Sequence, residues 1–397
     1  MSERESSEAD VGPDALRAVQ QPIAQATGLP NPAYTSATHF RRERDSLIGP
    51  TWTGLIFTDA LPDRPYALPV DFMGMPLLVL RDRAGELRVF HNVCSHRGMR
   101  LVDAARDAPT AVTCPYHAWT YDLAGRLRGT PHVGGVNQHQ CPGFDRSKHG
   151  LVPVRSAVWM GILFVNLSGD APAFIDHIAP LEARMAQFIG VDAWPSLRPA
   201  PGQPGLSLEI RSNWKLAVEN YCEAYHLPWI HPALNSYSRL EDHYCFADAQ
   251  EFSGQGSLAY RLSVVAGTRL PRFEGWPADR LHEAEYPALY PNVMLGFQAD
   301  HVFAVIITPL APDLSREEFR LYFAGEGAAD PRFTASRLAT LESWRVVFQE
   351  DVAAVEGLQR GRASPGFRGG VYAPGMDGPT HHFHRWAAAR LERAGAR

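Results

Sequence analysis

Two pairs of cysteine and histidine residues lie close together in the first third of the chain. Cys94 and His96 form a Cys-x-His pair, and Cys114 and His117 form a Cys-x-x-His pair after an interval of 17 residues. Two thiolates and two neutral imidazoles can hold a [2Fe–2S] cluster, with the cysteines on one iron and the histidines on the other. The same residue types also form structural zinc sites. The ligands alone therefore predict a compact metal site and leave both metals open.

The residues around these pairs carry a family resemblance. The segment Asn92–Gly98 frames the first pair, Pro115 lies inside the second, and Trp119 follows it. Here the chain resembles the Rieske domain of ring-hydroxylating and N-demethylating oxygenases, whose pattern is C-x-H near a following R-G and then C-P-x-H-x-W. The resemblance runs from about His91 to Trp119 and implies a [2Fe–2S] cluster. The ligands that it implies are Cys94, His96, Cys114 and His117.

Short β-rich runs separated by turn signals extend from Trp52 to Leu167. Leu77–Leu80 and Leu87–Phe90 predict a hairpin that leads into the first ligand pair. Thr120–Asp122 and Gly125–Leu127 predict another hairpin just after the second pair. The two pairs should therefore lie on adjacent loops of a small antiparallel sheet, where their side chains can converge on one cluster.

The pattern of elements predicts two domains and an N-terminal arm. Trp159–Val165 predicts a last buried strand, and Phe174–Ile189 predicts a helix, so we place the boundary between them near residue 168. We expect a helical arm over residues 1–45 that packs on the catalytic domain, a Rieske domain over 46–168, and a catalytic domain over 169–397.

A second candidate metal site lies in the stretch that follows. Its apolar spacing predicts a helix over Trp214–His226. His226 and His231 are five residues apart, which is about 140° around an ideal helix, so a straight helix would not present both to one ion. Pro228 interrupts the helix between them, and this break would let both imidazoles turn inward.

Two histidines need a carboxylate to complete a 2-His-1-carboxylate iron site, which leaves coordination positions open for O2. A late helix offers Glu350, Asp351 and Glu356. Most acidic residues on such helices face solvent. Spacing does not choose among the three.

The family resemblance extends to this region and selects one of the three acidic residues as the iron ligand. Glu223-x-x-His226-x-x-x-x-His231 is similar to the family's acidic-x-x-His-x-x-x-x-His motif, and the segment around Glu350-Asp351 is similar to the one whose aspartate binds iron. The resemblance implies that His226, His231 and Asp351 bind a mononuclear iron. It also implies that the Glu223 carboxylate bridges the cluster ligand His117 of one subunit and His226 of the next.

The resemblance implies an α+β fold. A small antiparallel β Rieske domain would precede a larger catalytic domain, in which helices flank and wrap an antiparallel sheet in the helix-grip arrangement. It implies a homotrimeric terminal oxygenase, a monooxygenase or dioxygenase of the EC 1.14 class. NAD(P)H electrons would arrive through a separate flavin and [2Fe–2S] reductase, because the sequence has no G-x-G-x-x-G stretch. The cluster would pass them to Fe(II), which activates O2 beside a small-molecule substrate.

Glutamate at position 223, where aspartate is commonest, is similar to the quaternary-ammonium branch of the family, which includes carnitine monooxygenase and glycine betaine demethylase. We therefore expect oxidation or N-demethylation of a small quaternary ammonium compound. The alternatives are ring hydroxylation or O-demethylation of an aromatic acid, and a non-catalytic Rieske electron carrier. Arg239 is a candidate partner for a substrate carboxylate. Candidate aromatic residues of the substrate pocket are Tyr237, Phe246, Tyr260, Phe297 and Phe303.

Composition sets the remaining bounds. The chain has 397 residues, 45% of them apolar, and a formal net charge of −5, so charge favours neither nucleic acid nor an anionic membrane as a partner. The segment Met1–Asp14 lacks the apolar core of a secretory signal, so we expect a cytoplasmic protein. Five cysteines without an export signal argue against a disulfide framework. We expect the histidines at 381, 382 and 384 to be surface and packing residues.

Overall fold

The computed structural model describes residues 10–190, 193–194, 197–199 and 205–395. They form two compact units. One unit is Leu55–Asp170, and the other consists of the segments on either side of it, up to Gly54 and from Ala171 onward. Residues 46–54, which we expected in the Rieske domain, lie in the second of these units. The first nine residues of the expected N-terminal arm lie outside the described residues.

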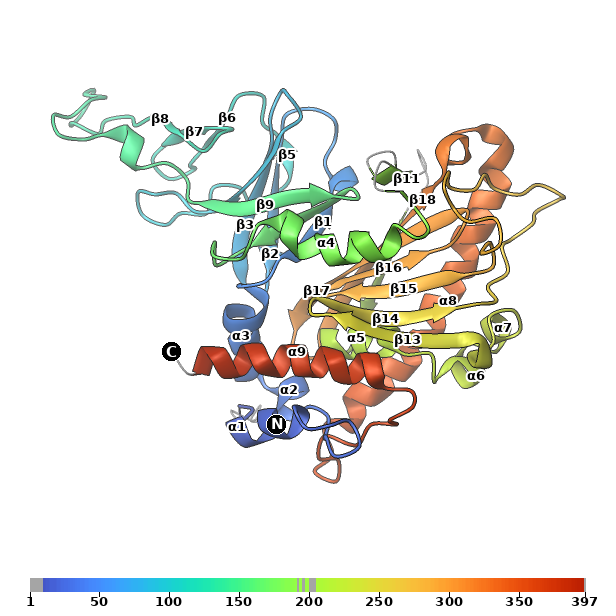
Figure 1. The fold of residues 1–397 in the computed structure, drawn as a ribbon. Helices are drawn as coiled ribbons and strands as arrows, with labels where there is room; N and C mark the ends of the chain where they lie inside the picture. The colour runs from blue at the N-terminus through green and yellow to red at the C-terminus, as the bar shows by residue number, and fades with distance from the viewer. Residues whose placement is uncertain (1–9, 191–192, 195–196, 200–204, 396–397) are drawn as a thin grey trace, which may run out of the picture. The chain divides into compact units, whose positions relative to one another are not determined.

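The unit Leu55–Asp170 is built from two sheets (Figure 1). The larger has the strand order β1-β10-β9-β4-β3-β2-β5, and the smaller has the order β6-β7-β8. The strands are β1 (Thr53–Phe57), β2 (Tyr66–Phe72), β3 (Met75–Arg81), β4 (Leu87–His91), β5 (Arg106–Asp107), β6 (Ala111–Thr113), β7 (Thr120–Asp122), β8 (Leu127–Gly129), β9 (Pro153–Trp159) and β10 (Ile162–Asn166). Both predicted hairpins are confirmed, since β3 pairs with β4 and β7 pairs with β8, each antiparallel.

The predicted strand Trp159–Val165 is wrong in one respect. The chain reverses inside it: β9 ends at Trp159, β10 begins at Ile162, and these two residues face each other in the register. Met160 and Gly161 have φ values of 49° and 67°. Two positive φ values at the centre of a two-residue loop match the twist of the flanking strands. A continuous run of apolar residues hides such a turn, because Trp159, Met160 and all five residues of β10 are buried.

The other unit contains an eight-stranded sheet. Its order is β11-β18-β17-β16-β15-β14-β13, with β12 also paired to β18. All residues of β14, β15 and β16 are buried, so this part of the sheet is covered on both faces. The strands are β11 (Arg198–Pro199), β12 (Leu206–Ile210), β13 (His243–Ala249), β14 (Phe252–Ser257), β15 (Ala284–Leu289), β16 (Val293–Phe297), β17 (His301–Ala311) and β18 (Leu314–Phe323).

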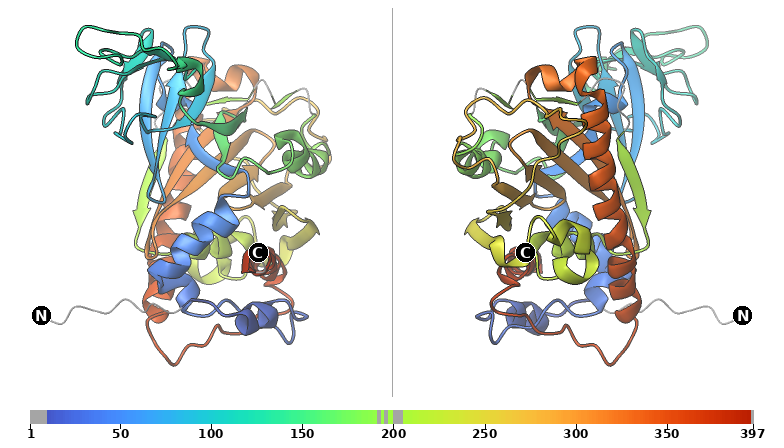
Figure 2. Two further views of the ribbon diagram at one scale, coloured as in Figure 1. Left: turned by 90° about the vertical axis from the view of Figure 1, so that its left-hand side faces the viewer. Right: turned by 90° about the vertical axis from the view of Figure 1, so that its right-hand side faces the viewer.

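Helices pack against this sheet, and the combination makes an α+β protein, as predicted. Helix α5 contacts β14, β15 and β17, α9 lies along β13 and β14, and the long α8 contacts α5 (Figures 1 and 2). The helices are α1 (Pro13–Val19), α2 (Pro32–Thr35), α3 (Ala37–Glu43), α4 (Phe174–Met185), α5 (Trp214–Cys222), α6 (Leu227–Ile230), α7 (Pro232–Asn235), α8 (Thr334–Gly361) and α9 (Gly378–Gly395). None of the described helices combines the length and apolar character that a membrane span requires.

The N-terminal segment is tied to this unit by buried polar contacts. The Lys215 ammonium at the start of α5 lies 2.7 Å from the Glu43 carboxylate at the end of α3, and both side chains are at most 1% exposed. His381 of α9 lies within 2.9 Å of the carbonyl oxygen of Val19. A buried ion pair of this kind is costly to break from one side, because the remaining charge has no water around it.

Candidate metal centres and the adjoining cavity

The two Cys/His loops have the same backbone geometry. In each loop the cysteine N–H donates to the carbonyl five residues later, and the N–H four residues later donates back to the cysteine carbonyl. This residue at the fourth position has a positive φ in both loops, 74° at Gly98 and 55° at Ala118. The bonds are Cys94 N to Met99 O (2.8 Å), Gly98 N to Cys94 O (3.0 Å), Cys114 N to Trp119 O (2.8 Å) and Ala118 N to Cys114 O (3.0 Å).

The loops bring the four predicted cluster ligands together. Cys94 and Cys114 are each 2% exposed, whereas the rings of His96 and His117 lie further out with their centroids 4.7 Å apart. The Nδ1 atom of His117 is buried and has no hydrogen-bond partner among the described residues. A buried nitrogen without a partner is costly unless it binds something. This donor set of two inner sulfurs and two outer imidazoles fits a [2Fe–2S] cluster with mixed ligands.

Tyr121 on β7 supports the first loop from behind. Its hydroxyl lies 3.2 Å from Cys94 Sγ, and it accepts a hydrogen bond from the Ser95 backbone N–H at 3.1 Å. Burial raises the pKa of Tyr121 to about 12, so the phenol keeps its proton and is placed to donate it toward the sulfur. Reasoning from the sequence did not single out Tyr121, although it lies only four residues after His117.

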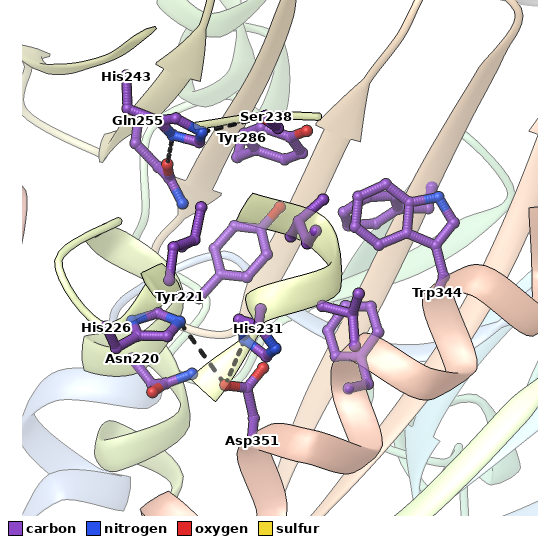
Figure 3. Close-up of a pocket in the computed structure, with 15 residues that line it drawn as sticks. Asn220, Tyr221, His226, His231, Ser238, His243, Gln255, Tyr286, Trp344 and Asp351 are labelled. Atoms are coloured by element: carbon purple, nitrogen blue, oxygen red, sulfur yellow. Dashed lines mark hydrogen bonds and ion pairs between the residues drawn. The ribbon is translucent and has the colours of Figure 1, made fainter. Parts of the chain in front are cut away.

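The second site is formed by one atom from each of three residues (Figure 3). Ligand atoms of His226, His231 and Asp351 all lie within 4.8 Å of one another. Asp351 Oδ1 is 3.0 Å from Nε2 of His231 and 3.7 Å from Nε2 of His226. Two imidazoles and one carboxylate that converge in this way can hold one metal ion and leave further coordination positions open.

The predicted helix over Trp214–His226 is too long. Helix α5 ends at Cys222, and Glu223 has extended backbone angles of −127° and 157°. His226 is the N-cap of the short helix α6, and Pro228 lies in the first turn of that helix, where proline loses no hydrogen bond. Both imidazoles do turn toward one point, but they do so from two short helices that follow a break at Glu223.

A carboxylate lies behind each imidazole. Glu223 Oε1 is 2.7 Å from Nδ1 of His226, and Glu350 Oε2 is 2.7 Å from Nδ1 of His231. If each Nδ1–H donates to its carboxylate, both Nε2 lone pairs face Asp351, which is the tautomer that a metal ion requires. Spacing left three acidic residues open as the third ligand. Of these, Glu350 lies behind the His231 ring and contacts its Nδ1 atom, and Glu356 accepts the Arg211 backbone N–H at 3.2 Å.

A cavity adjoins these ligands. Aromatic side chains from α5, β15, β17 and α8 line it (Figure 3). The ring centroids of Phe303 and Trp344 are 4.4 Å apart, and those of Tyr286 and Trp344 are 6.2 Å apart. The aromatic lining residues are Tyr221, Tyr286, Phe303, Trp344 and Phe348.

Of the five aromatic residues that we proposed for the pocket, only Phe303 lines the cavity. Phe246 lies under the Arg184 guanidinium, and Phe297 packs on Trp194. Tyr260 stacks behind Trp344 with a centroid separation of 6.3 Å, and Tyr237 packs in turn on Tyr260. These candidates come from the predicted sheet and loops between His231 and Asp351 and leave out α8, the helix that carries Asp351. Trp344 and Phe348 precede Asp351 by seven and three residues, and that helical spacing is the signal that identifies them.

Arg239 is also not a cavity residue. Its guanidinium is exposed and lies 3.1 Å from both the Glu241 and the Asp242 carboxylates. Instead, Ser238, His243 and Gln255 supply polar groups to the lining. The His243 Nδ1 atom is 2.6 Å from Gln255 Oε1, and its Nε2 atom is 3.0 Å from Ser238 Oγ. Burial lowers the pKa of His243, so this ring is neutral at pH 7.

Two further histidine groups have structural partners. Trp344 donates its indole N–H to Nε2 of His301 at 2.8 Å, and Nδ1 of His301 lies 2.6 Å from the Asp300 carboxylate. At the other end of the unit, His384 Nε2 is 2.9 Å from the Glu219 carboxylate. His384 is therefore a buried packing residue, as is His381, rather than a surface residue.

Comparison with known proteins agrees with this geometry. The Rieske [2Fe-2S] domain family matches residues 51–140, and the ring hydroxylating alpha subunit (catalytic domain) family matches residues 202–393. The carnitine monooxygenase oxygenase subunit of Escherichia coli K12 is 26% identical over 87% of each chain. The chloroplastic choline monooxygenase of Arabidopsis thaliana is 27% identical over 91% of this chain and 82% of its own.

Solved structures share the fold. A quaternary ammonium Rieske monooxygenase in complex with L-carnitine superposes with a TM-score of 0.73 over 97% of this chain and 99% of its own, at 22% identity. Naphthalene 1,2-dioxygenase from Rhodococcus sp. superposes with a TM-score of 0.71 over 95% of this chain and 96% of its own, at 18% identity. With both of its domains matched, the chain belongs to the Rieske-type non-haem iron oxygenases, which are oxidoreductases with a [2Fe–2S] cluster and a mononuclear iron.

Proposed function

We propose that this chain is a terminal oxygenase component that oxidises a small quaternary ammonium compound at a C–H bond next to nitrogen. The observation that carries the proposal is the aromatic cavity directly beside His226, His231 and Asp351. Aromatic faces attract a tetraalkylammonium ion through their quadrupoles and do not require a counter-charge. Relatives named as carnitine, glycine betaine and choline monooxygenases support the same substrate class.

In this proposal the residues of the two sites have separate roles. The ligands Cys94, His96, Cys114 and His117 would hold the [2Fe–2S] cluster, and His226, His231 and Asp351 would hold Fe(II). The cluster supplies electrons one at a time when bound, and the iron supplies O2 activation. Glu223 and Glu350 hold the Nδ1–H groups of the two iron-site imidazoles and keep their Nε2 atoms toward Asp351. The aromatic wall orients the ammonium group and excludes water.

The reaction balances as a monooxygenation. The substrate C–H carbon gains one oxygen atom from O2, and the other oxygen atom leaves as water with two electrons and two protons from outside the chain. Oxidation at an N-methyl carbon gives a hydroxymethyl group that breaks its C–N bond and releases formaldehyde, the amine and a proton. The electrons come from NAD(P)H through a flavin and [2Fe–2S] reductase.

The assembly that we propose is a homotrimer of cytoplasmic subunits, each with an N-terminal arm, a Rieske domain and a catalytic domain. Within it, Glu223 would accept a second imidazole N–H, from His117 of the neighbouring subunit. Exposed aromatic residues beside each partner support such a contact. Tyr116 next to His117 is 58% exposed, and Tyr225 and Trp229 near Glu223 are 44% and 70% exposed. Exposed aromatic residues are typical of interface anchors.

The test is substrate-dependent O2 uptake with a surrogate reductase. A panel of quaternary ammonium compounds is compared with a panel of aromatic acids, and formaldehyde is measured in parallel. We expect uptake and oxidised product only with the ammonium panel. Turnover of aromatic acids alone would instead identify a ring-hydroxylating or O-demethylating enzyme. An Asp351→Ala protein should keep its cluster absorption but lose mononuclear iron and turnover. Full iron content in that variant would refute the assignment of this ligand.

A further inference from the structure

The substrate cavity has no cationic side chain in its described lining. Its fifteen lining residues include neither lysine nor arginine, and their only carboxylate is that of Asp351, which we assign to the iron. A bound molecule therefore meets aromatic faces and uncharged polar groups. This composition suits the ammonium end of a substrate but offers no counter-charge to an anionic end.

The arginines nearest in sequence to the polar lining residues have other partners. Arg239 is paired with Glu241 and Asp242 on the surface. Arg261 is exposed, and its guanidinium lies over the ring of Tyr237 at 5.1 Å from the centroid. Tyr237 itself does not line the cavity. Neither arginine is placed to pair with a carboxylate inside it.

Three uncharged polar residues of the lining, Ser238, His243 and Gln255, are bonded to one another, and Asn220 adds an amide. Ser238 Oγ lies 2.8 Å from Ser257 Oγ, and His243 bridges Ser238 and Gln255. The Gln255 amide donates in turn to the Glu223 carbonyl at 3.5 Å. A substrate hydroxyl can join such a chain, because it both donates and accepts. A carboxylate only accepts, and each of its oxygens needs a donor to replace water.

From this arrangement we infer that the substrate is an ammonium cation whose far end carries no carboxylate and is instead a hydroxyl or a short alkyl group. The inference rests on the proposed function and narrows it, because it separates cationic ammonium alcohols from zwitterionic betaines. A buried carboxylate without a cationic partner is strongly disfavoured. A site that discriminates in this way rejects the wrong ligand by leaving its charge unpaired.

Choline and glycine betaine form a matched pair of probes, since they differ only in a CH2OH group against a carboxylate. Binding of each to the iron-loaded, full-length protein is measured by calorimetry without O2, and turnover is measured with a surrogate reductase. We expect a dissociation constant for choline at least tenfold below that for glycine betaine, and the same order in kcat/KM. Equal or tighter binding of glycine betaine would overturn the inference and leave the proposed function intact. Binding of neither, with turnover of aromatic acids, would overturn both.

Two variants test whether the missing charge is the cause. Leu234 lines the cavity and is half-buried, so Leu234→Arg adds the absent cation. This variant should lower the ratio of the glycine betaine dissociation constant to the choline dissociation constant at least tenfold. Leu338→Arg adds the same residue at a position that is 52% exposed on α8, outside the cavity, and should keep the wild-type ratio. A folded Leu234→Arg protein with an unchanged ratio would contradict the inference. An Arg261→Gln protein that selectively loses glycine betaine binding would also contradict it, because it would identify a carboxylate partner.

Discussion

The Glu350 carboxylate lies 2.7 Å from Nδ1 of His231, on the side of the ring opposite Asp351. Glu350 and Asp351 are neighbours in the sequence, yet they contact the two different nitrogens of one imidazole. The pair holds the ring in one orientation from both sides. Since His231 is only 2% exposed in its side chain, water cannot take over the role of Glu350.

Replacement of Glu350 by leucine should therefore weaken iron binding without removing a ligand. Loss of such an outer partner typically lowers metal affinity by about 10–100-fold. Iron content after dialysis against a chelator series is the measurement, with the absorption of the cluster as an internal reference. Glu342→Gln is a matched control, because Glu342 is an exposed acid on the same helix, paired with Arg345. Equal iron retention in both variants would show that Glu350 does not orient His231.

Glu223→Gln should keep both metal centres and lose most turnover. The wild-type carboxylate accepts the His226 Nδ1–H and also the backbone N–H of His226 at 3.2 Å. An amide has one acceptor oxygen where a carboxylate has two, so it cannot keep every acceptor contact and bridge a second imidazole. We expect at least a tenfold lower steady-state rate, with normal product yield in a single turnover of fully reduced protein. An unimpaired steady-state rate would rule out the bridge.

Tyr121→Phe should lower the reduction potential of the cluster. Its hydroxyl is 3.2 Å from Cys94 Sγ, and a hydrogen bond to a ligand sulfur stabilises the more negative, reduced state. One such bond is worth about 0.5–1.5 kcal/mol, which for one electron corresponds to ~20–60 mV. Spectroscopic redox titration of the two proteins measures the difference. The Tyr66→Phe protein is a control, because Tyr66 lies on β2 of the other sheet of this unit. An unchanged or higher potential in Tyr121→Phe would contradict this role.

A pH effect is expected from Glu317 of β18, which shares a small cavity with Asp351. Burial first, and then the Asp351 charge, raise the pKa of Glu317 from 4.5 to about 8. Because the pKa of this acid is raised in the folded state, the folded protein keeps the proton up to a higher pH than the unfolded chain does. The ionised Glu317 carboxylate therefore lowers the free energy of unfolding. This effect is absent below pH 4.5, grows as the pH rises, and is complete above pH 8.

Glu317→Gln should therefore stabilise iron-depleted protein more at pH 8 than at pH 5, by roughly 3.5 kcal/mol at most. Denaturant unfolding at the two pH values measures this difference. Glu318→Gln, at the adjacent position on the same strand, serves as the control. A Glu317→Gln protein whose stabilisation is independent of pH would show that Glu317 ionises normally.

The convergence of the four predicted cluster ligands could be foreseen from the sequence, because they lie in two short loops. Cys94 and Cys114 each start a loop whose shape depends on local hydrogen bonds and one residue with positive φ, so spacing alone conveys the geometry. Spacing alone was not enough to predict the iron site. His231 and Asp351 are 120 residues apart, and only the family motif connected them before the structure did.

The cavity was predicted poorly, for a physical reason. An aromatic residue that faces a cavity and one that faces the core look alike in sequence, since both are apolar and both lie on strands or helices. Tyr260 and Phe303 illustrate this: Phe303 reaches the cavity, whereas Tyr260 lies one layer behind it against Trp344. The end of α5 was missed for a related reason. The carboxylate of Glu223 bonds the backbone N–H of His226, and such a local side-chain contact replaces the next helical turn.

The hydrogen-bonded series Trp344, His301 and Asp300 gives the cavity one immobile wall. The Trp344 indole is held by the hydrogen bond of its N–H to the buried His301, so this side chain cannot rotate away to admit a larger substrate without breaking that bond. A wider substrate range would have to come from other lining residues, such as the half-buried Leu234 of α7. Laboratory or natural evolution of this enzyme toward larger amines would accordingly begin with residues of the α6–α7 segment and leave the tryptophan in place.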